Sequence, residues 1–193
     1  ATDTARTFEV VRGDLHRTRT VESPVPVAAD GEIVVGVRAF GFTANNISYA
    51  VFGDMLGYWQ FFPSEGEWGR IPTWGFADVV DSAHPDVAEG TRLFGYFPMA
   101  THLVMRPGAV DPTGLVDTSD HRASLPSAYN SYRDAAADPL YDPDREGAQM
   151  LLWPLFFTGF VIDRFLVAND DFGAGVHILS SASSKTAIAT AHC

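Results

Sequence analysis

The sequence predicts a mixed α/β protein in which a small β-barrel or β-sandwich is followed by a helix–strand–helix segment. The first observation is a run of β-branched and aromatic residues at 32–42 (EIVVGVRAFGF), with further apolar stretches of strand length after it. The second is a long apolar helical pattern at 149–167, followed by a short apolar strand at 177–180 and a helix at 184–191. Because the order changes from strands to alternating helix and strand, we expect a domain boundary near residues 145–150.

The remaining elements follow from local signals. Strands are also expected at 8–12, 74–80 and 92–105, and several short strands at this spacing are typical of a barrel or sandwich. A helix is expected at 44–52, with Thr43 or Asn45 as its cap and Gly53-Asp54 closing it. Residues 111–147, rich in Asp, Pro, Ser and Tyr, predict a long surface excursion with short helical pieces. The expected domains are therefore 1–147 and 148–193.

Composition restricts the partners and the compartment. The formal charge of −11 repels phosphate backbones, so we expect no nucleic-acid partner. The apolar stretch at 150–168 contains Pro154, Asp163 and Arg164, which favours a buried helix over a membrane span. A single cysteine, Cys193, allows no disulfide within the chain, and a signal-peptide pattern is missing at Ala1–Val10. Both observations favour the cytoplasm.

Three segments, in this order, resemble the zinc-free quinone-oxidoreductase-like branch of the medium-chain dehydrogenase/reductase superfamily. They are VGVRAFGFTANNISYAVFG, the stretch IPTWGFADVVDSAHPDVAEGTRLFGYFPMATHLVMRPG, and LLWPLFFTGFVIDRFL followed by GAGVHILSSASSKTA. More specifically, GDMLGYWQFFP, SDHRASLP and HILSSASSKTA resemble the group called domain of unknown function 2855, which has no assigned reaction.

The resemblance implies a GroES-like β-barrel on the substrate side, followed by the first strand and helix of a Rossmann-type domain. A Rossmann-type sheet needs several parallel strands, whereas this chain offers one, so we favour a truncated chain or fragment. A chain that packs onto a partner and a natural loss of the domain are the alternatives. We expect the 193-residue chain alone to bind dinucleotide weakly and to lack turnover.

Zinc is not expected at either of the positions where relatives hold it. A structural zinc lobe needs four ligands, usually thiolates, and a catalytic zinc needs about three protein ligands. Cys193 is the only thiol, and the six histidines are scattered without short ligand spacings.

The turn that would hold a dinucleotide has lost the family's glycines. Ser181, Ser183, Ser184, Lys185 and Thr186 stand where the resemblance places the pyrophosphate of NADP or NAD. Serine hydroxyls and the lysine charge could contact phosphates, with Lys185 favouring a phosphorylated cofactor. The alternative is a serine-rich helix cap that binds nothing.

The resemblance also implies a proton donor in the substrate cleft. Tyr49 and Tyr58 stand where relatives place such tyrosines, and Asn46, with Asn45, could hydrogen-bond a substrate carbonyl. The alternative is amphipathic packing of both tyrosines. The aromatic residues between Tyr58 and Trp74 could line an apolar pocket or plug one end of a barrel.

Residues of the excursion are further candidates for the site. His121 and Arg122, and the run Tyr129, Asn130 and Tyr132, could reach the cleft. We favour the alternative that they tie the loop down through hydrogen bonds.

Two functions of different classes follow. The first is an NAD(P)H-dependent reductase of small conjugated carbonyl or quinone-type substrates. The second is a non-redox protein on the same fold, either a small-molecule binding protein or a cofactor-free cyclase or lyase. Whether the chain is part of an enzyme stays open at this point, as does assembly as a homodimer.

Overall fold

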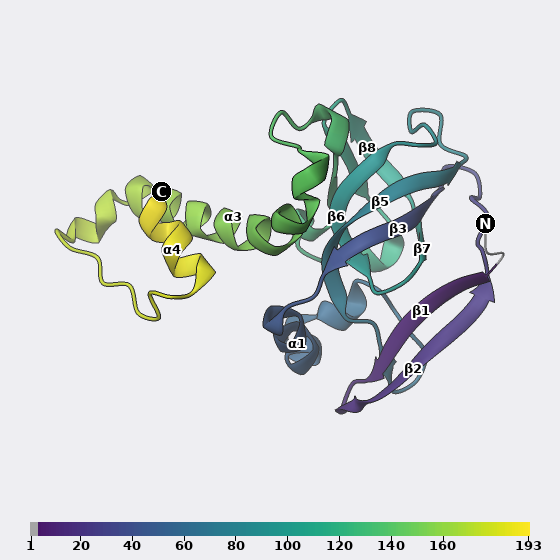
Figure 1. Ribbon diagram of the computed structural model, residues 1–193, viewed down its shortest axis with the longest axis horizontal. Helices are drawn as coiled ribbons and strands as arrows, with labels where there is room; N and C mark the ends of the chain where they lie inside the picture. The colour runs from purple at the N-terminus through teal and green to yellow at the C-terminus, as the bar shows by residue number, and fades with distance from the viewer. Residues whose placement is uncertain (1–3) are drawn as a thin grey trace. The chain divides into compact units, whose positions relative to one another are not determined.

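The computed structural model describes residues 4–193 and divides the chain into two compact units (Figure 1). The first unit ends at Asp144, and the second runs from Arg145 to Cys193.

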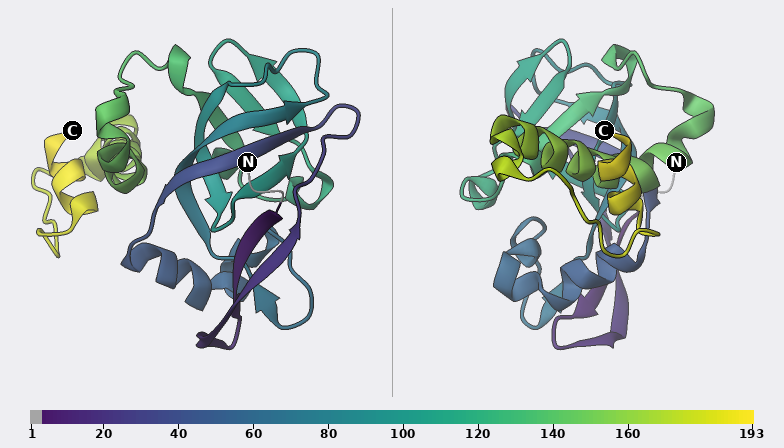
Figure 2. Two further views of the ribbon diagram at one scale, coloured as in Figure 1. Left: turned by 45° about the vertical axis from the view of Figure 1, so that its right-hand side comes forward. Right: turned by 90° about the vertical axis from the view of Figure 1, so that its left-hand side faces the viewer.

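A seven-stranded antiparallel sheet forms most of the first unit, and both views in Figure 2 show it curled. In order across the sheet, the strands are β7 (His102–Met105), β3 (Ile33–Gly41), β5 (Pro72–Ser82), β6 (Arg92–Pro98), β10 (Ser131–Asp134), β9 (Gly114–Asp117) and β8 (Pro107–Asp111). The expected strand at 92–105 is therefore two strands, because the chain turns at Pro98, whose carbonyl accepts from the Ala100 amide.

The core of this unit lies along β3, β5 and β6. Ile33, Val34 and Val35 are fully buried, and β3 pairs with β5 along its length. The β-branched run therefore forms a strand as expected; its first half, Ile33–Gly36, is buried on both faces, whereas Arg38 and Phe40 are exposed. Leu93 and Phe97 of β6 complete the same apolar cluster.

A smaller sheet contains β2 (Asp14–Pro24), β1 (Thr4–Val11) and β4 (Trp68–Gly69), in that order. Most of β2 is exposed and polar, so its sequence carries no apolar alternation that would have announced a strand. β1 links the two sheets, because the Phe8 amide donates to the Met99 carbonyl and the Thr101 amide donates to Arg6.

The helix expected after β3 is confirmed as α1 (Ala44–Val51), with Thr43 as its N-cap. The sequence predicts that Gly53 ends the helical region, but the structure differs. Gly53 begins α2 (Gly53–Leu56), and a 3-10 turn η1 (Tyr58–Gln60) follows. The reason is a close approach: a Cβ on Gly53 would lie 2.2 Å from the indole nitrogen of Trp59. The chain folds back here because glycine leaves room for Trp59.

The expectation of a surface excursion at 111–147 is wrong for residues 111–134. Residues 111–134 contribute β9 and β10 to the main sheet and the 3-10 turns η2 (Asp120–Arg122) and η3 (Ser127–Tyr129). Arg122 and Tyr132 are each 1% exposed. Polar composition suggested a surface loop, but ion pairing and strand pairing bury it. Two further turns, η4 (Ala135–Ala137) and η5 (Pro143–Arg145), come after β10.

The second unit contains α3 (Glu146–Ala168), the turn η6 (Asp170–Gly173) and α4 (Lys185–His192). The two helices touch at Gly159, where a Cβ would lie 2.7 Å from that of Ala189. Both helices were expected, but the buried strand at 177–180 was not correct: these residues form no strand, and Ile178 is 92% exposed. The described part of this unit has no strand with which to pair.

The expectation that α3 is buried is also wrong. Most of its large apolar side chains are exposed, including Phe157 at 41% and Phe165 at 58%, and Gly159 is the one buried residue of this helix. By length and composition alone, the helical stretch Pro143–Ala168 could cross a membrane, with a mean hydropathy of 1.6. That criterion is weak for a single helix, because the core helix of a soluble protein meets it too.

Candidate functional site

Tyr49 and Tyr58, the two proposed proton donors, lie together in the first unit. Tyr49 is on α1 and Tyr58 begins η1, and their ring centroids are 4.5 Å apart. Two tyrosines from distant segments join them: Tyr129 of η3 and Tyr96 of β6, whose rings are 4.7 Å apart. Tyr129 meets the Tyr58 ring at 6.1 Å, and Tyr49 meets Tyr96 at 6.2 Å. We call these four residues the tyrosine cluster.

Hydrogen bonds orient the phenol hydroxyls. Asn45 Nδ2 donates to the Tyr49 hydroxyl at 2.9 Å. A second hydrogen bond joins the side chains of Tyr129 and Tyr58. Each of the two sequence-predicted tyrosines therefore has a polar neighbour that holds its hydroxyl in place.

Burial raises the pKa of three phenols in the tyrosine cluster, those of Tyr49, Tyr96 and Tyr129. Burial raises the pKa of Tyr49 to about 12, and the neighbouring Tyr58 adds to this increase, whereas the hydrogen bond from Asn45 opposes it. Burial also raises the pKa of Tyr96 and of Tyr129 well above the ordinary value, helped for Tyr129 by the hydrogen bond with Tyr58. At neutral pH each of these three hydroxyls carries a proton that it could donate.

Asn46 has a structural role that differs from that of its neighbour Asn45. Its Oδ1 accepts from the Thr43 amide at 2.7 Å, and its Nδ2 donates to the Pro72 carbonyl at 2.9 Å. The side chain is 4% exposed. The amide therefore closes a capping box and ties α1 to β5.

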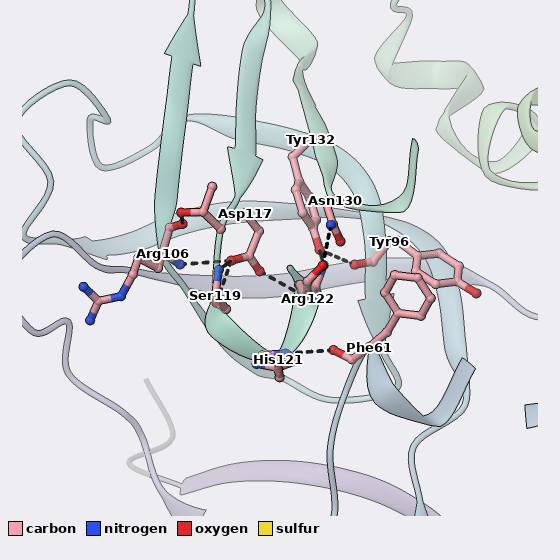
Figure 3. Close-up of polar contacts among 10 residues, drawn as sticks. Phe61, Tyr96, Arg106, Asp117, Ser119, His121, Arg122, Asn130 and Tyr132 are labelled. Atoms are coloured by element: carbon pink, nitrogen blue, oxygen red, sulfur yellow. Dashed lines mark hydrogen bonds and ion pairs between the residues drawn. The ribbon is translucent and has the colours of Figure 1, made fainter. Parts of the chain in front are cut away.

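A buried polar network that sequence reasoning only partly anticipated connects η2 and β10 to Tyr96 of the tyrosine cluster (Figure 3). Arg122 Nη1 donates to the Tyr132 hydroxyl at 3.0 Å, and that hydroxyl donates to the Tyr96 carbonyl at 2.6 Å. Asn130 Nδ2 donates to the Arg122 carbonyl at 3.2 Å. The expectation that these excursion residues tie the loop down is confirmed.

Asp117 is the member of this network that the sequence did not single out. Its Oδ2 lies 3.2 Å from Arg122 Nε, and its Oδ1 accepts from the Ser119 hydroxyl at 2.6 Å. His121 bonds through Nε2 to the Phe61 carbonyl at 3.2 Å, so Nε2 carries the proton. Nothing local distinguishes Asp117 from the chain's other acidic residues, since its burial arises from strand pairing.

The serine-rich turn lies in the second unit. Ser184 caps α4, with its Oγ accepting from the Ala187 amide at 3.1 Å, and the Ser184 amide donates to the Ser181 carbonyl. Ser181 has a φ of 51°. Ser181, Ser183 and Lys185 are exposed, and Thr186 is half-buried. Hydroxyls and one cation therefore surround the start of α4.

Within residues 4–193, no group of three or more His, Cys, Asp or Glu side chains is placed to hold a metal ion.

A model of the family described as "Protein of unknown function (DUF2855)" matches residues 40–193. The chain belongs to this family. The region matched by the DUF2855 model covers Tyr49, Tyr58, the Asp117–Arg122 network and the serine-rich turn. No curated protein matches the chain.

The DUF2855 chain is also similar to solved structures, among them quinone-oxidoreductase-like proteins of the medium-chain dehydrogenase/reductase superfamily. Human synaptic vesicle membrane protein VAT-1 homolog-like protein is 16% identical, with 97% of this chain and 51% of that chain covered and a TM-score of 0.47. The quinone oxidoreductase from Coxiella burnetii is 13% identical, with 65% and 40% covered and a TM-score of 0.37.

A third similar structure is that of crotonyl-CoA carboxylase/reductase AntE in complex with NADP. It is 15% identical, with 55% of this chain and 36% of that chain covered and a TM-score of 0.35. These three solved chains are matched over 36–51% of their own length.

Proposed function

We propose that the DUF2855 protein containing this chain is a zinc-independent, NAD(P)H-dependent oxidoreductase acting on a small conjugated carbonyl or quinone-type substrate. The observation that carries the proposal is the pairing of Tyr49 and Tyr58, whose rings lie 4.5 Å apart with hydrogen-bond partners on both hydroxyls. A positioned phenol is one of the groups that can deliver a proton to a reduced carbonyl compound, and either tyrosine of this pair could serve.

The chain's own residues would manage the proton. A nicotinamide, when bound, supplies a hydride to the conjugated carbon. The pKa of Tyr49, raised to about 12 by burial, keeps its proton available until negative charge develops on the substrate. Tyr49 or Tyr58 then gives up its proton, and the carbon–carbon double bond has gained one hydride and one proton. The hydrogen bond from Tyr129 would stabilise the phenolate left on Tyr58.

The serine-rich turn fits one part of a dinucleotide. Ser181, Ser183, Ser184, Lys185 and Thr186 offer hydroxyl donors, a positive charge and a helix start, which suit a pyrophosphate. Among the residues that the structure describes, the Lys185 ammonium and the Ser181 and Ser183 hydroxyls have no hydrogen bond. We propose these three side chains as the phosphate contacts of NADP or NAD.

Other parts of the proposal concern architecture and setting. The first unit would be a GroES-like substrate-side domain, and the second would begin a Rossmann-type domain whose first strand forms only beside neighbouring strands. Asn46 would position α1, and hence Tyr49, without touching substrate. We propose the cytoplasm as the location and a homodimer as the assembly, with no zinc, nucleic acid or membrane as partner.

A second function is favoured by the turn itself. The Ala187 amide already donates a hydrogen bond to Ser184 Oγ. This amide is one of the donors that a phosphate would use at this helix start. The turn also lacks the glycines that medium-chain reductases have at this position. The alternative is therefore a non-redox binding protein, or a cyclase or lyase without cofactor. It keeps the tyrosine cluster as a ligand site and predicts no nicotinamide binding.

The test is reduction of a panel of enones and quinones by the complete protein with NADPH or NADH, followed through nicotinamide absorbance. Tyr49→Phe and Tyr58→Phe should lower kcat by about 10²–10⁴-fold, the usual contribution of a general acid. Tyr141→Phe, whose ring lies against Phe76 outside the cluster, should retain activity. Full activity in the Tyr49→Phe, Tyr58→Phe double variant would exclude the assignment.

Cofactor binding is tested separately. Lys185→Ala should weaken NADPH binding in calorimetry, and Lys185→Arg should restore most of it, because the cation is the feature that contacts phosphate. Equal binding by all three proteins would exclude Lys185, and no binding by the unchanged protein would favour the non-redox alternative.

A further inference from the structure

The first unit holds a pocket of about 310 Å³ that does not contain the tyrosine hydroxyls. It lies between β1, the end of β2, β7 and η2. Its apolar wall includes Phe61, Phe62 and Leu103, and its polar side includes Arg70, Asp117 and Arg122. The volume is at the lower end of the range of about 300–1,000 Å³ that small-molecule sites occupy. A small ligand with an apolar body would fit it.

The polar side of this pocket contains a guanidinium with unused donor capacity. Arg122 is 1% exposed, and only its Nη1 makes a hydrogen bond, to Tyr132. Nε forms an ion pair with Asp117 at 3.2 Å without hydrogen-bond geometry, and Nη2 has no partner within the described part of the chain. A buried charged donor without an acceptor is costly, so an acceptor near it is favoured.

The charges around the pocket leave a positive excess. Glu9, 1% exposed, is paired with Arg19 at 2.6 Å and with Arg70 at 2.9 Å. Asp117 is paired with Arg122. Of these charged groups, Arg70, Arg122 and Asp117 line the pocket, and Arg19 and Glu9 lie next to Arg70 and cancel each other, so the local charge is +1 in a chain of net −11. That excess suits a ligand with a single negative charge.

We infer that this pocket binds a small carboxylate with an aromatic or aliphatic body. The carboxylate accepts from Arg70, the more accessible of the two lining guanidiniums with 32% of its side chain exposed, and lies in the field of Arg122. The apolar body packs against Phe62 and Leu103. A dianion such as phosphate is less suited, because Asp117 lines the same pocket and the excess is one charge.

The inference goes beyond the oxidoreductase proposal and does not depend on it, because the pocket requires no nicotinamide. Phe61 and Phe62 are shared walls: their rings lie 6.4 Å from Tyr58 and 6.1 Å from Tyr96, respectively, and both line the pocket. A bound carboxylate would therefore lie beside the tyrosine cluster without touching its hydroxyls.

Benzoate is the probe, titrated into the ¹⁵N-labelled chain and followed by amide chemical shifts. Saturable shifts are expected in β7 and η2. Benzamide, the neutral isostere, should bind roughly tenfold or more weakly, because it lacks the charge-assisted hydrogen bond. Equal binding of benzamide and benzoate, or no saturable shift with benzoate, would overturn the inference.

Two variants and a matched control locate the site. Arg70→Gln should weaken benzoate binding roughly tenfold, since it removes the accessible cation. Leu103→Trp should fill the pocket and abolish binding while the remaining amide spectrum is retained. Arg38→Gln, at a separate pocket on the Phe40 side, should bind as the unchanged chain does. Benzoate binding that survives both Arg70→Gln and Leu103→Trp places the ligand elsewhere and overturns the assignment.

Discussion

Arg122 Nε and Asp117 Oδ2 lie 3.2 Å apart, and each of the two side chains is 1% exposed. The pair fastens η2 to the end of β9, and through Tyr132 it also reaches the Tyr96 carbonyl of β6. The segment that carries Tyr129 is thereby held against the main sheet. The tyrosine cluster is therefore supported by an ion pair that contributes no atom to it. Figure 3 shows this pair and its connection through Tyr132 to Tyr96.

Breaking this pair from the acidic side should be strongly destabilising. Asp117→Asn leaves a buried guanidinium without its counter-charge, and the free energy of unfolding should fall by about 3–5 kcal/mol. Chemical denaturation measures it. Glu22→Gln is the control, because Glu22 pairs with Arg6 with both side chains more than half exposed, and it should cost no more than about 1 kcal/mol. Similar losses in the two variants would contradict the reading of the Asp117 pair as buried.

Acid stability should depend on Glu9. Burial alone would raise its pKa, but hydrogen bonds from Ser64, Arg19 and Arg70 outweigh that effect and hold the pKa below the ordinary 4.5. A carboxylate with a lowered folded pKa adds stability above pH 4.5, and this stability is lost as pH falls through the lowered value. Glu9→Gln should therefore flatten the acid limb of a stability–pH curve.

The exposed Glu22→Gln variant should keep the acid limb of the unchanged chain. If Glu9→Gln and the unchanged chain lose stability with the same slope below pH 4.5, Glu9 is not the group responsible.

Alkaline stability should depend on Tyr49. Because burial raises its pKa from 10.0 to about 12, the folded state holds this proton more tightly than the unfolded state. Its contribution is full below pH 10 and is lost as pH rises towards 12. Tyr49→Phe should therefore lose less stability than the unchanged chain across this interval.

Tyrosinate absorbance checks the same point directly. In Tyr49→Phe, one phenol fewer should titrate above pH 10. Part of the absorbance change above pH 10 should remain, because burial also raises the pKa of Tyr132 to about 12. A chain whose tyrosines all titrate at the ordinary value before unfolding would show that the cluster is hydrated.

The contact between α3 and α4 should be sensitive to a single methyl group. A Cβ at Gly159 would lie 2.7 Å from the Ala189 Cβ and 2.7 Å from the Thr190 amide nitrogen. Gly159→Ala should cost about 1–3 kcal/mol of overpacking and speed amide exchange in α4. Gly147→Ala, in the same helix with nothing within 4 Å, should instead be neutral or stabilise slightly. Unchanged exchange in Gly159→Ala would mean that the two helices do not touch in solution.

Local sequence patterns alone predicted much of the fold. The β-branched run that became β3, the apolar spacing and Thr43 cap of α1, and the family resemblance all depend on residues close together in the chain. Such signals report which face of an element is buried and where it starts. The resemblance also proposed Tyr49 and Tyr58 as site residues, and these two lie nine positions apart in the chain.

Only the tertiary structure decided the rest. Tyr129 meets Tyr58 and Arg122 is buried because β10 pairs with β6 and β9, a long-range register that no local spacing encodes. Residues 177–180 have the composition of a buried strand, yet they are exposed because a strand needs a partner for its backbone. The hydrophobic periodicity of a segment predicts which of its faces would be buried. That face is buried only where another part of the protein packs against it.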